Sequence, residues 1–131
     1  MGYSAKAVVL RGAAQTIGAS ITDQAITDNF YIPWELSTTY TIAILVASST
    51  VVSSVVVKLQ HRMSSETDWL DSKTVTITND ASDTTFHLTA LDALTADQAL
   101  LPLMPSARLV VSTGVGDSCV ITNVWIPVIY T

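Results

Sequence analysis

Apolar residues alternate with serine, threonine or other polar residues in several segments of this 131-residue chain, and this alternation constrains the fold more than any other feature. A strand points successive side chains to opposite faces, so a two-residue period predicts half-buried β-strands. Serine and threonine supply 32 residues, while valine and isoleucine, which favour strands, supply 25. Turn signals at short intervals separate about eight such runs. We therefore expect an all-β chain, either an antiparallel β-sandwich or a jelly roll.

The expected elements fill a single domain over residues 1–131, with residues 1–12 as a candidate N-terminal arm. The clearest strands are expected at residues 6–11, 40–46, 55–62, 75–77, 86–88, 108–113 and 118–130. The polar residues 79–83 predict a turn, and Gly-Val-Gly-Asp at 114–117 predicts a hairpin turn. At most one short helix is expected, around residues 91–101.

A membrane span is the main alternative for residues 36–57, because these 22 residues carry no charge. Nine of them are serine or threonine, however, and several lie in the middle of the run. Two strands joined by a tight polar turn account for this composition better than a helix does. We therefore expect no membrane segment.

Charge and cysteine content exclude further classes of protein. Six basic residues stand against eleven acidic ones, a net charge of −5, so no nucleic-acid partner is expected. Charged residues make up only 13% of the chain, about half the usual share. Cys119 is the only cysteine, which excludes an internal disulfide, and its apolar strand predicts a small buried side chain.

No residue motif in the sequence indicates a catalytic reaction. His61 and His87 fall at outward-facing or mixed strand positions, and neither has a second histidine at metal-ligand spacing. The carboxylates flanking Trp69 and in the turn that follows match no calcium-loop motif, which leaves a cation at Asp68, Asp71, Asp80 or Asp83 undecided. We expect no enzyme, cofactor or metal; an enzyme built from Asp68, Asp71, His61 and His87 is the third-ranked hypothesis.

The aromatic residues are the candidate binding residues. Trp34 and Trp69 lie near expected strand ends, where they either stack on a ligand or close the ends of the sandwich. Trp125 lies in the apolar final strand and is expected in the core. Tyr3 lies in the candidate N-terminal arm. We therefore expect Tyr3, Trp34 and Trp69 to be interface residues.

Four stretches of the sequence resemble small structural proteins of tailed bacteriophages. These are a strand ending in Leu-Gln at residues 57–62, a polar loop with Trp followed by an acidic residue at 67–71, an Arg-Leu-Val-Val strand at 107–111, and the closing strand at 120–125. The resemblance covers roughly the last three-quarters of the chain. It departs at residues 63–66, where Met-Ser-Ser-Glu replaces the usual Ser-x-Asp-Gly turn.

The resemblance implies a non-enzymatic virion protein, made in the host cytoplasm, that decorates a capsid and stabilises it by bridging capsid subunits. It also implies a homo-oligomer, with a trimer favoured, and the major capsid protein as partner. A chain with few charges fits this role, since interfaces can cover its apolar surface. A related head or tail accessory protein remains open, and the alternative function is a carbohydrate- or receptor-binding module of a phage tail or a bacterial surface.

Overall fold

The computed structural model describes residues 4–31, 41–89 and 106–130, which form ten β-strands and, within those ranges, no helix. The strands are β1 (Ser4–Arg11), β2 (Gln15–Ile17), β3 (Gln24–Ala25), β4 (Phe30–Tyr31), β5 (Thr41–Thr50), β6 (Val55–Arg62), β7 (Leu70–Ile77), β8 (Ser82–Thr89), β9 (Ser106–Thr113) and β10 (Ser118–Tyr130). The expected all-β class is confirmed. The helix expected around residues 91–101 lies outside the described residues.

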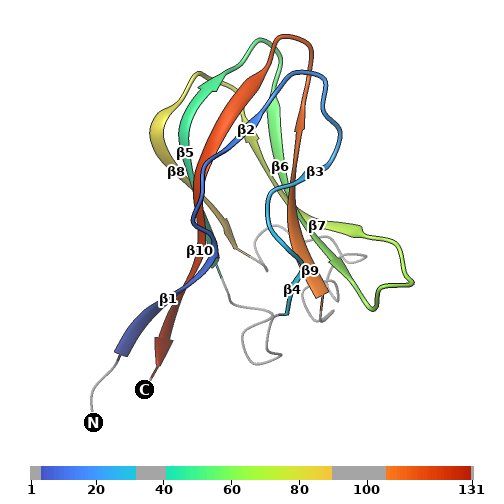
Figure 1. Ribbon diagram of the computed structural model, residues 1–131, viewed down its shortest axis with the longest axis vertical. Coiled ribbons are helices and arrows are strands. Elements are labelled where there is room, and N and C mark those ends of the chain that lie inside the picture. The colour runs from blue at the N-terminus through green and yellow to red at the C-terminus, as the bar shows by residue number, and fades with distance from the viewer. Residues whose placement is uncertain (1–3, 32–40, 90–105, 131) are drawn as a thin grey trace.

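The strands form two antiparallel sheets of five strands that face each other, as Figure 1 shows. Sheet A has the order β1-β10-β5-β8, with β2 also paired to β10, and sheet B has the order β3-β9-β6-β7, with β4 also paired to β9. If β1 with β2 and β3 with β4 are each taken as one interrupted strand, the chain has eight strands. Their order is then first-last-third-sixth in sheet A and second-seventh-fourth-fifth in sheet B, which is the order of a jelly roll.

The core lies between the sheets and follows the alternation in the sequence. In β5, Ile42, Ile44 and Val46 point inward and are fully buried, and the inward residues of β6 are buried in the same way. Branched side chains suit a pleated surface that packs on a second sheet about 10 Å away.

Within the described ranges, no helix is long and apolar enough to cross a membrane.

The short turns carry the chain from one sheet to the other. The turn after β9 lies at residues 114–117 as expected, but the hairpin expected there is wrong, because β9 belongs to sheet B and β10 to sheet A. The alternating pattern locates successive strands along the chain, but it does not indicate which strands pair with each other. Among the described strands, β6 and β7 do form a hairpin, with pairing from Val55↔Ile77 to His61↔Leu70.

Asp117 holds two of these turns together at one end of the sandwich. Its carboxylate accepts hydrogen bonds from the backbone N–H groups of Val52, Ser53, Ser54 and Gly114, at 2.6–3.2 Å, and from the Ser53 hydroxyl at 2.7 Å. The Ser53 bonds are the main cause that lowers the pKa of Asp117 well below its usual range. A side chain on Gly114 would collide with the Ser53 hydroxyl and the Asp117 carboxylate and would therefore disturb the hydrogen bonds between them.

The two chain ends form a two-stranded ribbon that projects from the sandwich (Figure 1). The N-terminal segment expected as an arm is β1, which pairs with β10 from Ser4↔Tyr130 to Arg11↔Val124. Pairing between β10 and β5 ends at Trp125↔Ala43. The outer part of the ribbon, Ser4–Ala7 with Pro127–Tyr130, therefore extends past the paired length of β5.

Candidate functional site

The outer face of sheet A carries an apolar hollow of about 320 Å³. It is lined by Val9 of β1, Leu45 of β5, and Asn123 and Trp125 of β10. Val9 pairs with Trp125, and Leu45 pairs with Asn123, so strand register places all four side chains on one face. Among the described residues that line the hollow, none carries a formal charge and Asn123 supplies the only polar side chain.

Trp125 therefore corrects the sequence analysis, which expected it in the core. The neighbouring residues Val124 and Ile126 point inward and are buried, and this turns Trp125 outward, where it is half-buried. An apolar strand with residues of similar hydropathy on both faces gives no signal for which face meets the other sheet. Val9, beside it, is 63% exposed.

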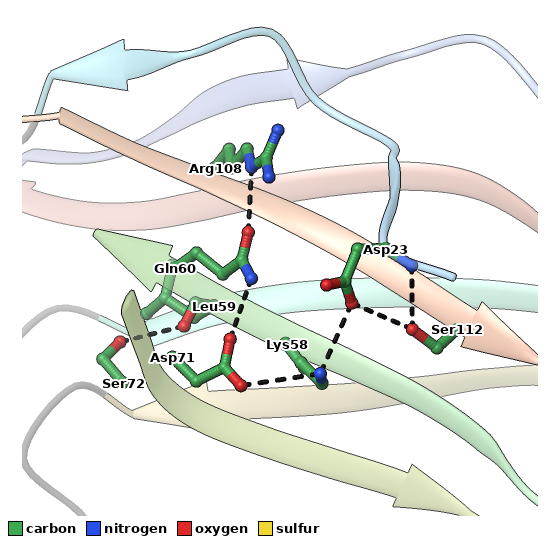
Figure 2. Close-up of polar contacts among 8 residues, drawn as sticks. All are labelled: Asp23, Lys58, Leu59, Gln60, Asp71, Ser72, Arg108 and Ser112. Carbon is green, nitrogen blue, oxygen red and sulfur yellow. Dashed lines mark hydrogen bonds and ion pairs between the residues drawn. The ribbon is translucent and has the colours of Figure 1, made fainter. Parts of the chain in front are cut away.

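The outer face of sheet B carries a chain of polar contacts instead (Figure 2). The Arg108 guanidinium donates through Nε to Gln60 Oε1 at 2.9 Å, and the Gln60 amide donates to Asp71 Oδ1 at 2.8 Å. Lys58 Nζ lies 3.5 Å from Asp71 Oδ2 and 3.4 Å from Asp23 Oδ1. Burial acts to lower the pKa of Lys58. The negative charge of Asp71 and the contacts of Lys58 with Asp23 outweigh this effect, so the pKa of Lys58 is raised.

Trp69 lies at one end of this chain of contacts, next to two arginines. The guanidinium carbon of Arg62, at the end of β6, lies 4.2 Å from the Trp69 ring centroid, and that of Arg108 in β9 lies 4.4 Å away. All three side chains are half-buried. We call Arg62, Trp69 and Arg108 the Arg–Trp cluster. Of the expected interface residues, Trp69 alone can be placed, because Tyr3 and Trp34 lie outside the described residues.

The two histidines occupy different environments. His61 corrects the expectation of an outward or mixed position: it is fully buried on the inner face of β6, and its Nδ1 lies 2.9 Å from Ser72 Oγ. The Ser72 hydroxyl donates its hydrogen to the Leu59 carbonyl at 3.0 Å, so it accepts from a protonated Nδ1. Burial lowers the pKa of His61 to about 4. His87 lies in β8 and is exposed.

The carboxylates considered for a cation are not brought together. Asp71 contacts Gln60 and Lys58, whereas Asp80 accepts a hydrogen bond from the Val51 backbone at 2.8 Å. Asp68 and Asp83 are exposed. Within the described ranges, no three His, Cys, Asp or Glu side chains lie close enough to hold a metal ion.

Cys119 is buried, as expected, on the inner face of β10. Burial raises the pKa of its thiol to about 11, because desolvation disfavours the thiolate. A thiol of this kind is a poor nucleophile at neutral pH.

Comparisons with known proteins add little to this picture. No protein-family model and no curated protein sequence matches the chain. Among solved structures, the chain is similar to one described as the crystal structure of PirA, with 12% sequence identity and a TM-score of 0.39, over 91% of this chain and 92% of that one. At this score the likeness carries no argument about function.

Neither arginine of the Arg–Trp cluster was expected from the sequence as a site residue. Arg62 and Arg108 are 46 positions apart in sequence, and only the pairing of β6 with β9 makes them neighbours. Their alternation within each strand does place them on the outer face, since Arg62 follows buried His61 and Arg108 lies between buried Ala107 and Leu109. The missing information was the strand order.

Proposed function

We propose that this protein is a non-enzymatic structural subunit that assembles through the outer face of sheet A, and that it acts as a capsid decoration protein of a tailed bacteriophage. The observation that supports the assembly role is the uncharged hollow formed by Val9, Leu45, Asn123 and Trp125. The virion setting and the trimeric state rest on the sequence resemblance to phage structural proteins.

The composition of this face suits contact with another protein. Aromatic residues are enriched and charged residues depleted at the centres of interfaces. Trp125 supplies a rigid aromatic surface, and the exposed Val9 side chain stands beside it on the paired strand. Burying such a surface contributes about 25 cal/mol per Å² of apolar area, so covering it favours association.

The role requires contact area and no reactive group. A protein that binds assembled capsid subunits but not separated ones raises the free energy of disassembly by its own binding energy. Jelly rolls occur in capsid and lectin domains, so the fold is compatible with this role without specifying it.

Capsid co-sedimentation with matched variants tests the proposal. Val9→Glu places a charge in the hollow, while Val115→Glu makes the same change in the β9–β10 turn, where the side chain is 81% exposed. We expect the wild-type protein and Val115→Glu to sediment with capsids of the phage that encodes the protein. Val9→Glu should bind at least about tenfold more weakly, because the glutamate has no partner in the interface between subunits, and a dissociated subunit loses the multivalent contact of the oligomer with the capsid.

Two outcomes contradict the proposal. Either the wild-type protein fails to bind these capsids, or the Val9 and Val115 variants bind them equally well.

A further inference from the structure

The Arg–Trp cluster lies on the outer face of sheet B, opposite the face used in the proposed assembly. Gln60 pairs with Arg108 across β6 and β9, and Arg62 lies two residues further along β6, so the two arginines are diagonal neighbours on one face. Trp69, from the β6–β7 connection, lies within about 4–5 Å of both guanidinium carbons. Cation–π attraction to the indole holds the two cations in place.

The hydrogen-bonding capacity of these guanidiniums is largely unused within the described part of the chain. Arg108 uses its Nε to bond Gln60, which leaves the outer N–H groups of its planar fork. Arg62 has a buried Nε with no hydrogen-bond partner. The ion pairs found among the described residues both belong to Lys58, so neither arginine is neutralised by a carboxylate there.

Two carboxylates on this face, Asp71 and Asp23, have other partners. Asp71 contacts Gln60 and Lys58, and Asp23 contacts Lys58 and the Ser112 hydroxyl, as Figure 2 shows. These contacts engage both carboxylates, and no ion pair with Arg62 or Arg108 is found among the described residues. Two neighbouring cations therefore lie together on a protein whose net charge is −5.

This arrangement has an electrostatic cost. Burial lowers the pKa of Arg108, and the positive charge of Arg62 lowers it further, although Asp23 acts in the opposite direction. An oxyanion bound by the two guanidiniums would relieve the repulsion and accept hydrogen bonds from the unused N–H groups. Guanidinium forks match the geometry of carboxylate and phosphate groups, with two parallel hydrogen bonds each.

We propose that Arg62 and Arg108, held by Trp69, form a binding site for an oxyanion, a carboxylate or phosphate group that is either free or carried by an acidic saccharide. Gln60 is a positioning residue, because its bond to the Arg108 Nε orients the fork. The site uses neither Val9 nor Trp125, so it stands whether or not the assembly proposal is correct.

Titration followed by NMR tests the site. The indole N–H signal of Trp69, assigned by comparison with Trp69→Phe, is recorded while inorganic phosphate, a galacturonic acid trimer or galactose is added at constant ionic strength. Saturable shifts with both phosphate and the trimer indicate a general oxyanion site, and shifts with the trimer alone indicate a saccharide-borne carboxylate. The neutral galactose should produce no shift.

Matched variants separate a defined site from general attraction between charges. Arg62→Gln and Arg108→Gln should each weaken binding at least about tenfold, because a charge-assisted hydrogen bond is lost. Arg11→Gln removes the same charge from β1 in sheet A and should leave the affinity unchanged. A well-dispersed spectrum for each variant shows that it is folded.

The proposal is wrong if neither anion shifts the Trp69 signal, if galactose binds as well as the trimer, or if Arg11→Gln weakens binding as much as the cluster variants do.

Discussion

At the scale of single residues, His61 shows how a core position changes the behaviour of a titratable group. The imidazole is fully buried and bonded to Ser72, and its pKa is lowered to about 4 from 6.5. Between these values the unfolded chain binds a proton that the folded chain does not. His61 therefore makes the free energy of unfolding rise with pH from about 4 to 6.5 and remain level above that.

The expected size of this contribution is about 3 kcal/mol over the whole window, since each unit of pKa shift corresponds to about 1.4 kcal/mol. Urea unfolding of wild-type protein and His61→Gln across this pH range measures it. Subtracting the two curves removes the carboxylates, which titrate in both proteins. If the difference between the curves does not change with pH, His61 is not buried as a neutral group.

At the scale of elements, the turns at one end of the sandwich depend on Asp117. The sequence analysis located the turn at residues 114–117, but it could not show that the Asp117 carboxylate reaches across to residues 52–54 of the β5–β6 connection. That contact needs the two turns to meet in space. The turn propensity of residues 114–117 therefore predicted the turn. Only the strand topology shows that Asp117 links it to the β5–β6 connection.

We expect Asp117→Asn to lower the melting temperature at pH 7, because an amide group cannot accept from all five donors and would direct its own N–H toward them. Asp83→Asn, at an exposed position with a φ of 46°, is the matched control, since asparagine tolerates this conformation. Because the folded-state pKa of Asp117 is depressed, the stabilisation is present above the ordinary carboxyl pKa and is lost as the pH falls below it. Equal melting temperatures for the two variants would show that Asp117 does not hold the turns.

At the scale of the whole molecule, alternation predicted the all-β fold and the positions of most long strands, because burial of every second side chain leaves a direct trace in the sequence. It could not predict which strands pair, and the functional faces depend on that pairing. Trp125 was expected inside and lies outside, and Arg62 and Arg108 become neighbours only through β6 and β9. The low charge content of 13% is consistent with a surface that a second protein covers.

Light scattering of the purified protein, over a range of micromolar concentrations, tests assembly through sheet A most directly. We expect a defined oligomer for the wild-type protein and for Val115→Glu. We expect Val9→Glu to dissociate toward monomer, because its new charge lies in the apolar hollow. A wild-type protein that stays monomeric throughout this range, or an oligomer that Val9→Glu leaves intact, would contradict it.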